Sequence, residues 1–498
     1  MDFNIPENVG IPSEKIIEYY KYLEDHNLSS HAVYIARGND IISFAHWKPF
    51  TRKFLHRMYS VSKSFVAIAV GFAMQDGLLD LDDPIVKYFP EETAGRADEN
   101  VQRQTIRHML MMSTAKPATN WFALPHPNRV DRYFDNPGPS RVPGTQFQYD
   151  SSGSFVLGAL VERLTGMPFM DYLRIKLFDK IGVSKEAYCL RCPGGHSWGD
   201  SGVMCTSLDL LKMVRFVANG GSWDGEQILD RDYVKAASSK QIDNNLIGIP
   251  DWETSGYGYQ IWMGLDDSFF FNGMGCQFGL YMPKKDMILV YNGDNQGKAG
   301  ALNTVMDGFR EIVYASAADA PIPLVAPGTV KCAKDRLRMM EENFQLMADK
   351  SDDTVPMADK INGKTFELAP NPMGITRFTI TVEENGDGRF CYTNAKGDLE
   401  LSFGMCRNIF GEFPHDGYSD EVGNVPIPGH RYKCAASAAW YSPYQFHLKV
   451  QIIDKYFGTM DTLFGFSSDG KRVCVQMTKT AEDFLHGYAG WADGKIVE

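Results

Sequence analysis

The chain has 498 residues, of which 44% are hydrophobic, and its 50 basic and 62 acidic side chains give a formal net charge of −12. This length and hydrophobic content can build the cores of two or three domains, so a disordered protein is excluded. The acidic balance, with no dense cluster of Lys and Arg, argues against a nucleic-acid partner.

Residues 1–15 contain neither a basic start nor a hydrophobic segment, and the longest apolar run, Phe65–Met74, is too short to cross a bilayer. We therefore expect a cytoplasmic protein without a membrane partner. The nine cysteines, an odd number in a large chain, favour reduced thiols over a disulfide framework. Cys189 and Cys192 form a lone C-x-x-C pair, too little for zinc, which leaves two ordinary thiols or a redox pair as alternatives.

The first half of the chain is predicted to be mainly helical, after an early hairpin. A helix over 13–26 precedes two strands, 32–36 and 41–44, that flank a polar turn. Further helical patterns follow at 60–76, 105–112, 153–165, 168–178 and 207–219. Strand patterns return at 257–264, 268–272, 279–282 and 287–292, before a helix over 299–315. This order predicts an α+β fold in which helices are inserted between parts of one antiparallel sheet.

A second unit is expected after an Ala- and Pro-rich stretch, 315–330, that has the composition of a linker. A charged helix around 333–349 follows, and then strand patterns alternate with turns to the end of the sequence. We predict three parts: an α+β domain over 1–318, a linker and helix over 319–360, and a β-barrel or β-sandwich over 361–498.

Ser60-Val61-Ser62-Lys63 opens an apolar helical run that Gly77 is placed to end. A serine hydroxyl is a poor nucleophile until a base accepts its proton, and a lysine three residues along a helix lies on the same face. The pair therefore predicts a nucleophile and its base. An ordinary N-capping serine is the alternative.

Two other stretches have the same Ser-x-x-Lys spacing but not the same context. Lys116, which pairs with Ser113, precedes a proline that cannot continue a helix, and Ser468 runs into an Asp-Gly turn before Lys471. Only the match at Ser60 can place both side chains on one helix.

Tyr149 lies on a loop that leads into the helix predicted over 153–165. A phenol near the cationic Lys63 would favour the phenolate, a base that can take the serine proton and later pass it to a leaving group. The alternative is a tyrosine whose hydroxyl caps a turn.

The glycine-rich stretch Asn272-Gly273-Met274-Gly275-Cys276-Gln277 falls between two predicted strands. Glycine at a strand edge lets a substrate carbonyl approach the backbone, so an N–H here can stabilise an oxyanion. A nucleotide-binding loop is excluded, because G-x-G-x-x-G is lacking and a strand follows.

Gly199-Asp200-Ser201-Gly202 has the spelling found around the nucleophile of trypsin-like proteases. A triad also needs a histidine base and an acidic partner, and nothing around the other histidines suggests them. We do not expect Ser201 to be a nucleophile.

The pieces at Ser60, Tyr149 and Gly273, in this order, resemble the serine β-lactamase and penicillin-binding-protein superfamily, and most of all its class C and esterase branch. Stretches 76–84, 105–110 and 143–166 are similar to that branch too, and the resemblance covers roughly residues 10–315. It implies a β-lactamase/transpeptidase-like fold without a metal or organic cofactor.

The resemblance also implies roles for individual residues. Ser60 would be the acyl-enzyme nucleophile, Lys63 its proton partner and Tyr149 the general base and acid. The backbone N–H groups of Ser60 and Cys276 would form the oxyanion hole. Ser151 stands where many members have Asn, and the substrate-binding residues would further include Gly273, Gly275 and Trp121, with Phe122, Tyr259 and Trp262 as other candidates for the pocket.

One departure from the superfamily bears on the substrate. Where penicillin-recognising members carry Lys-Thr-Gly, this chain has Gly273-Met274-Gly275. A substrate carboxylate then loses a charge-assisted hydrogen bond of about 1.5 to 3 kcal/mol. We therefore expect a hydrolase of esters or amides of small molecules or short peptides, with possible self-association left open. Acyl transfer, D-amino-acid peptidase activity and a binding protein without turnover are the alternatives.

Overall fold

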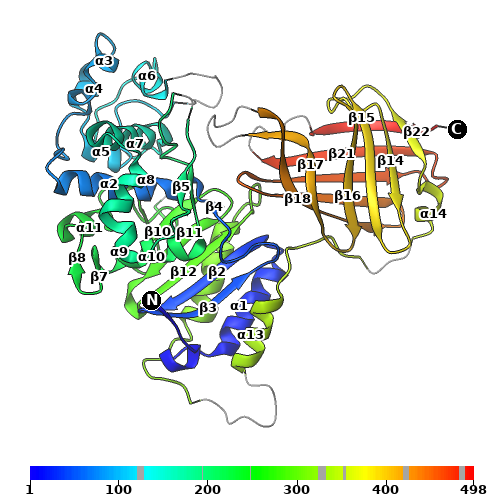
Figure 1. The fold of residues 1–498 in the computed structure, drawn as a ribbon, viewed down its shortest axis with the longest axis horizontal. Coiled ribbons are helices and arrows are strands. Elements are labelled where there is room, and N and C mark those ends of the chain that lie inside the picture. Colours follow the sequence, from blue (N-terminus) through cyan, green and yellow to red (C-terminus); the bar gives the residue numbers. More distant parts are fainter. Residues whose placement is uncertain are drawn as a thin grey trace. The chain divides into compact units, whose positions relative to one another are not determined.

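The structure is a computed structural model that describes residues 1–119, 128–192, 194–246, 248–323, 333–351, 355–418, 426–481 and 488–497. Two compact units are present, the first from Met1 to Gln345 and the second beginning at Leu346 (Figure 1). The limits at 318 and 361 remain predictions of domain boundaries. Helix α13 (Ala333–Asn343) contacts α1 and β3 and so belongs to the first unit.

A seven-stranded sheet forms the centre of the first unit, in the order β1-β3-β2-β12-β11-β10-β9. All neighbouring strands are antiparallel except β1 and β3. The early hairpin is joined to the late strands through β2 and β12, so the helices are inserted between parts of one sheet, as predicted. The strands are β1 (Asp2–Phe3), β2 (Ser30–Arg37), β3 (Asp40–His46), β9 (Trp262–Met263), β10 (Phe269–Gly273), β11 (Gln277–Met282) and β12 (Met287–Gly293).

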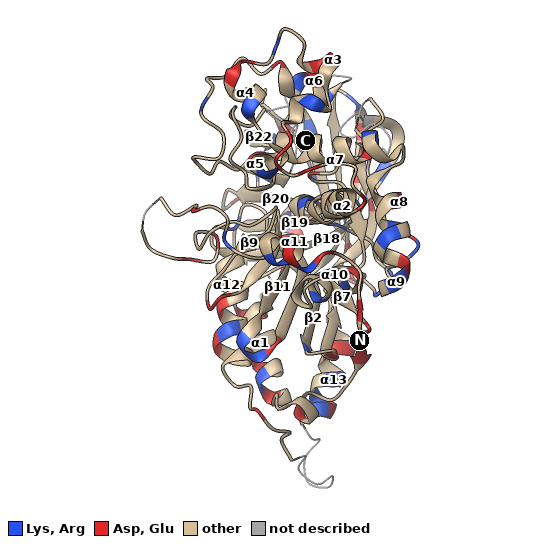
Figure 2. Cartoon of the chain, turned by 90° about the vertical axis from the view of Figure 1, so that its left-hand side faces the viewer, with Lys and Arg blue, Asp and Glu red and all other residues tan. Residues whose placement is uncertain are grey.

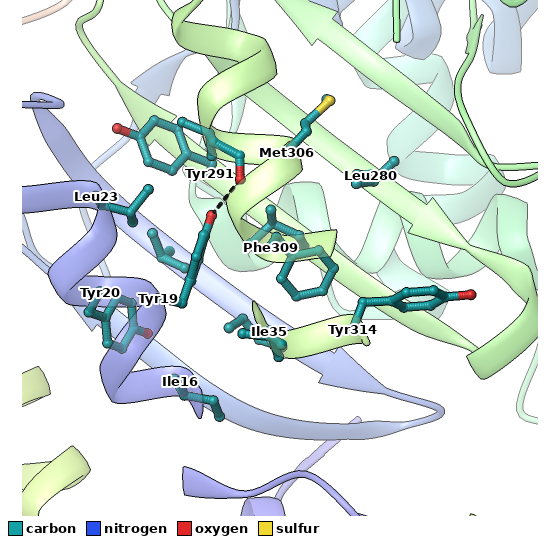
Figure 3. Packing of buried hydrophobic residues seen from close by; sticks show 14 of the residues in the cluster. Ile16, Tyr19, Tyr20, Leu23, Ile35, Leu280, Tyr291, Met306, Phe309 and Tyr314 are labelled. Atoms are coloured by element: carbon teal, nitrogen blue, oxygen red, sulfur yellow. Dashed lines mark hydrogen bonds between the residues drawn. The ribbon is translucent and has the colours of Figure 1, made fainter. Parts of the chain in front are cut away.

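One face of this sheet is covered by α1 (Ser13–Asp25), α12 (Ala301–Gly308) and the π-helical turn η6 (Phe309–Tyr314). Alternate strand residues such as Ile35 and Leu280 join side chains of α1 and η6 in one buried cluster. Figure 3 shows Tyr19 at its centre, where its hydroxyl donates to the Val305 carbonyl at 3.1 Å. Burial of a polar tip is tolerated here because the hydroxyl has found an acceptor.

Helix α10 (Ser207–Ala218) packs on the other face, against β2, β11 and β12, and α2 (Ser62–Gln75) packs against α7 (Ser151–Thr165). α2 is buried along nearly its whole length, and Gly77, with φ of +73°, follows its end. The remaining elements are η1 (Pro6–Val9), β4 (His56–Arg57), η2 (Tyr59–Val61), η3 (Ile85–Lys87), α3 (Pro90–Thr93), α4 (Glu99–Arg103), α5 (Ile106–Leu110), α6 (Arg129–Phe134), α8 (Phe169–Leu173), η4 (Arg174–Phe178), α9 (Asp179–Ile181), β5 (Tyr188–Cys189), β6 (Val203–Cys205), β7 (Ser222–Trp223), β8 (Glu226–Gln227), α11 (Arg231–Ala237) and η5 (Pro283–Lys285).

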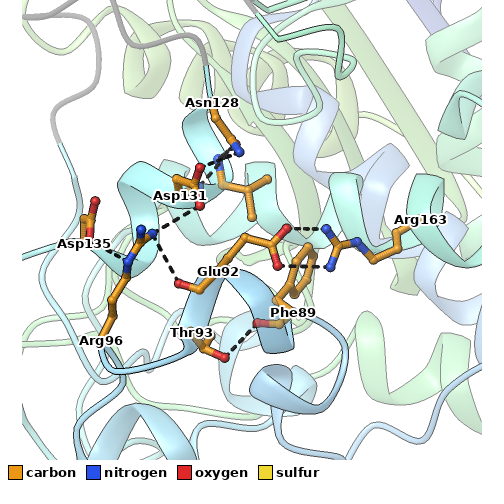
Figure 4. Close-up of polar contacts among 9 residues, drawn as sticks. Phe89, Glu92, Thr93, Arg96, Asn128, Asp131, Asp135 and Arg163 are labelled. Carbon is orange, nitrogen blue, oxygen red and sulfur yellow. Dashed lines mark hydrogen bonds and ion pairs between the residues drawn. The ribbon is translucent and has the colours of Figure 1, made fainter.

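Ion pairs fix the small helices around α7. The guanidinium of Arg163 on α7 holds both carboxylate oxygens of Glu92 on α3 (Figure 4). Arg96 contacts Asp131 and Asp135, each at 3.2 Å, and so ties the end of α3 to α6. Elsewhere charges of both signs alternate along α1, α9 and α13 (Figure 2).

The prediction of a strand over 257–264 was wrong, because within this range only Trp262 and Met263 form a strand, β9. Gln260, within this range, has a positive φ of +56°, a left-handed conformation that departs from the extended backbone of a strand. The side chain of Gln260 is used instead to donate to the carbonyls of Met109 and Leu110. Gln260 therefore links this irregular stretch to α5.

The second unit is a closed barrel. Its strands follow the order β16-β15-β14-β13-β22-β21-β20-β19-β18, and a parallel pairing of β16 with β18 completes the ring. Strand β17 pairs with β18 outside it. Helix α14 (Met357–Ile361) precedes β13 (Thr365–Leu368), β14 (Arg377–Val382), β15 (Asp387–Asn394), β16 (Gly397–Met405), β17 (Ile409–Tyr418), β18 (Pro426–Ser442), β19 (Gln445–Ile453), β20 (Phe457–Phe466), β21 (Arg472–Ala481) and β22 (Gly490–Ile496).

Stacked and edge-on aromatic rings fill the barrel, among them Phe366, Phe378, Phe390 and Phe464. The structure thus confirms the barrel over the sandwich. No helix in the described ranges combines the length and hydropathy required to span a bilayer.

Candidate active site

Ser60 and Lys63 form a hydrogen-bonded pair at the start of α2. Ser60 is the middle residue of the turn η2, and Lys63 follows in the first turn of α2. The Nζ of Lys63 donates to Ser60 Oγ at 2.9 Å and to the carbonyl oxygen of Asp200 at 2.8 Å. Only 1% of Lys63 is exposed, so its amine is held between these two acceptors and away from bulk water.

A buried arginine, Arg57, packs against the residue that precedes Ser60. Tyr59, just before Ser60, has φ of +46°, a left-handed conformation that is costly for a residue with a Cβ. The guanidinium of Arg57 stacks 4.3 Å from the Tyr59 ring and donates to the carbonyl and hydroxyl oxygens of Ser201, both at 3.1 Å. Ser201 thus anchors this arginine, in keeping with the expectation that it is not a nucleophile.

Tyr149 reaches the same place from the loop before α7. Its ring stacks on Trp262 with centroids 5.6 Å apart, and Lys63 Nζ lies 5.1 Å from its ring centroid. Asp150 caps α7 by accepting from the Gly153 N–H at 3.0 Å, and burial raises the pKa of its carboxyl group. Among the described residues, the Tyr149 hydroxyl has no hydrogen-bond partner, which leaves it available to a substrate.

The strands on both sides of the turn between β10 and β11 contact η2, which contains Ser60. A Cβ on Gly273 would lie 2.4 Å from the carbonyl oxygen of Met58, so only glycine allows this strand to approach η2. Gly275 and Cys276 follow with φ of +76° and +70°. Within the described part of the chain, no acceptor takes the backbone N–H of Ser60 or of Cys276.

A buried amide network supports this turn from beneath. Gln277 donates to the Met274 carbonyl at 3.3 Å, and its own side-chain oxygen accepts from Asn292 at 3.0 Å. The Oδ1 of Asn292 in turn accepts from the Ser207 hydroxyl at 2.7 Å. Sequence reasoning missed these positioning groups, because they come from three separate elements and carry no motif.

Ser60, Tyr149 and the turn share one pocket of about 640 Å³. It is lined by Ser60, Tyr149, Glu253, Trp262, Asn272, Gly273, Met274, Gly275, Cys276, Asn295, Gln296, Gly297, Lys298, Gly300, Ala301, Leu302 and Asn303. Trp262 thus lines the pocket, as do both glycines. Trp121 and Phe122, two predicted pocket residues, lie outside the described residues.

Two other candidates are placed differently. Tyr259 is buried, and its hydroxyl accepts from Arg107 at 2.6 Å, away from the residues that line the pocket. Ser151 is the first residue of α7 and does not line the pocket, and in the described ranges its hydroxyl donates to no group. A contact of Ser151 with Lys63 or substrate stays a prediction.

The thiols of the first unit are unsuited to nucleophilic chemistry. Burial raises the pKa of Cys276 to about 12, with Glu253 and Asp294 adding to the shift, so this thiol is protonated at neutral pH. Burial also raises the pKa of Cys189 and of Cys192, and both are free thiols. In the part of the chain that the structure describes, no group of three or more His, Cys, Asp and Glu residues could hold a metal ion.

Comparison with known proteins places this geometry in a family. A profile of the Beta-lactamase family matches residues 19–304. The 6-aminohexanoate-dimer hydrolase of Paenarthrobacter ureafaciens is 24% identical over 219 residues, which are 41% of this chain and 56% of that protein. The β-lactamase of Escherichia coli K12 is 29% identical over 140 residues, 27% of this chain and 35% of that one. The chain therefore spans about half or less of the length of these curated relatives.

A solved structure extends the likeness of fold beyond the first unit. The octameric penicillin-binding protein homologue from Pyrococcus abyssi matches 97% of this chain and 99% of that chain, at 15% identity and a TM-score of 0.50. The profile covers more than half of the 498 residues and contains Ser60, Lys63, Tyr149 and Cys276. On this evidence of sequence and geometry together, the chain belongs to the Beta-lactamase family.

Proposed function

We propose that the protein is a serine hydrolase that cleaves an ester or amide bond of a small molecule or short peptide through an acyl-enzyme on Ser60. The observation that carries this proposal is the 2.9 Å contact between Ser60 Oγ and the buried Lys63 amine, at the wall of an open pocket. A hydroxyl and a base within hydrogen-bond reach are the signature of an activated nucleophile.

In the acylation step, Ser60 Oγ forms a bond to the substrate carbonyl carbon while its proton passes to the Lys63 and Tyr149 pair. The N–H groups of Ser60 and Cys276 donate to the developing oxyanion, and the oxyanion then collapses as the bond to the leaving group breaks. Tyr149 returns the proton to the leaving oxygen or nitrogen. Water, deprotonated by the same pair, releases the acid and restores Ser60.

Two features of the pocket favour substrates other than β-lactams. The turn carries Gly273-Met274-Gly275 in place of a cationic residue. Lys298, the lysine among the described pocket residues, donates to the backbone carbonyls of His26 and Asn27. The described residues that line the pocket thus offer a substrate carboxylate no lysine or arginine apart from Lys298, and we expect slow turnover of a chromogenic cephalosporin.

An active-site phosphonate probe with intact mass and peptide mapping tests the proposal. We expect one adduct on Ser60 in the native protein and none in Ser60→Ala, whereas Ser468→Ala, at the exposed spacing match, should label normally. Native protein that takes up no adduct would favour a binding protein without turnover.

Hydrolysis of p-nitrophenyl esters and aminoacyl amides in the presence of competing amines or alcohols separates hydrolysis from transfer. Free acid as the main product supports the hydrolase. Transfer products in excess would make the protein an acyltransferase.

A further inference from the structure

The pocket wall beside the oxyanion turn carries an unusual charge pattern. Glu253 and Asn272 both line the pocket that contains Ser60, and Asn272 Nδ2 donates to Glu253 Oε1 at 2.8 Å. The amide fixes one carboxylate oxygen, and among the described residues no group donates to the second. Glu253 is therefore an oriented acceptor that faces the same cavity as the nucleophile.

Among the described residues, no ion pair joins Glu253 to a cation. Glu253 and Lys298 are the charged side chains among the described pocket residues, and the Lys298 amine is bound to backbone carbonyls. Burial is the main cause of the raised pKa of the Cys276 thiol; the charges of Glu253 and Asp294 add to it, and the charge of Lys298 opposes it. Glu253 is therefore the acidic side chain of the described pocket wall, and its carboxylate is an acceptor for a cationic ligand.

We propose that Glu253 forms a subsite for a protonated amine, so that the substrates of Ser60 are esters or amides that also carry an ammonium group. This inference rests on the proposed hydrolase. An ammonium N–H donating to a carboxylate makes a charge-assisted hydrogen bond, roughly twice as strong as a neutral one. The apolar side chains of Trp262, Met274 and Leu302 line the same pocket and suit a hydrocarbon segment between the amine and the reacting carbonyl.

Matched pairs of p-nitrophenyl esters test the subsite. β-Alanyl and butanoyl esters differ only in an ammonium or a methyl group at the end, and 6-aminohexanoyl and heptanoyl esters repeat the comparison at greater reach. We expect kcat/KM for the cationic member of at least one pair to exceed that of its neutral partner by about tenfold, corresponding to one charged hydrogen bond.

Glu253→Gln keeps the acceptor for Asn272 and removes the charge. We expect it to bring the favoured pair to near parity, by lowering kcat/KM for the cationic ester and leaving the neutral ester unchanged within about twofold. Asp251→Asn is the matched control. Burial is the main cause of the raised pKa of the Glu253 carboxyl group, and the charge of Asp251 adds to it. Asp251 does not line the pocket, so the preference should persist in this variant.

Equal rates for both members of every pair in the native protein would overturn the subsite, as would an equal loss on both in Glu253→Gln. Inhibition of the native protein gives a readout that needs no variant. Butylammonium should compete with ester hydrolysis more strongly than butanol does, and less strongly at high salt. Equal inhibition by the two would also contradict the proposal.

The two proposals fail separately. Hydrolysis that continues in Ser60→Ala removes the proposed function, whereas labelling of Ser60 without a preference for cationic esters removes only the amine subsite.

Discussion

The start of α2 and the turn between β20 and β21 have the same Ser-x-x-Lys spacing and entirely different surroundings. In the first, Lys63 is buried and donates back to Ser60. In the second, Ser468 and Lys471 are exposed, and the turn is organised by Asp469, which accepts from the Lys471 N–H at 3.0 Å. The Ser-x-x-Lys spacing brings the amine to the hydroxyl only where the backbone is helical and the lysine is buried.

Substitution of Lys63 is expected to have the largest effect, and Lys471 is its matched control. Lys63→Met keeps the apolar stem but removes the amine that we propose as proton acceptor. We therefore expect the rate at which the phosphonate probe labels Ser60 to fall by about a thousandfold or more. Lys471→Met should leave the rate unchanged. Acylation kinetics with a Tm for each variant check this, and a near-normal rate in Lys63→Met would remove Lys63 from the mechanism.

Removal of a tyrosine hydroxyl should have opposite effects in the two units. Tyr149→Phe retains the ring that stacks on Trp262 and loses the hydroxyl, so acylation should fall by about a hundredfold with little change in Tm. Tyr392→Phe, in the barrel, removes a buried hydroxyl that lies 3.0 Å from that of Tyr488. We expect the opposite outcome there, a stability loss of about 1 kcal/mol at full activity.

Substitutions at two glycines test the close approach of β10 to η2. Gly273→Ala forces a methyl group against the Met58 carbonyl, so β10 must shift away from η2 and widen the oxyanion site. We expect acylation to drop by about tenfold to a hundredfold, since small misplacements are costly. Gly465→Ala is the control, because its Cβ would have its nearest neighbour at 3.9 Å. Equal effects in both variants would contradict this reading.

The smallest expected effect is on the pH dependence of stability and comes from His56. Burial lowers the pKa of His56 to about 3, so the native state keeps it neutral while the unfolded chain takes up a proton below about pH 6.5. The contribution of His56 is therefore present above pH 6.5 and is lost as the pH falls toward 3. The loss of stability, relative to neutral pH, is about 2 kcal/mol at pH 5.

Urea unfolding followed by tryptophan fluorescence at several pH values measures this loss. His56→Phe should flatten the acid limb, because Phe50 and Phe54 already surround this position. The exposed His26→Gln should not. The same acid slope in His56→Phe and the native protein would exclude His56 as the cause.

The apolar run correctly predicted the buried helix α2 that carries Lys63, whereas Ser60 lies in the 3-10 turn η2 just before it. Strand patterns separated by turns indicated the β-rich second unit. The strand over 257–264 failed because Gln260 bonds to distant carbonyls of α5, a partner that its local sequence does not reveal. The amide network of Gln277, Asn292 and Ser207 was missed for the same reason.

By itself, the sequence determined which local segments can form helices, strands and tight turns, because those depend on side-chain periodicity and on glycine. Only the tertiary structure decided which distant groups meet: the Asp200 carbonyl on Lys63, the Trp262 ring on Tyr149, and Glu253 in the pocket of Ser60. Contacts of this kind depend on how the elements pack, and packing sums many weak interactions that no short stretch of sequence encodes.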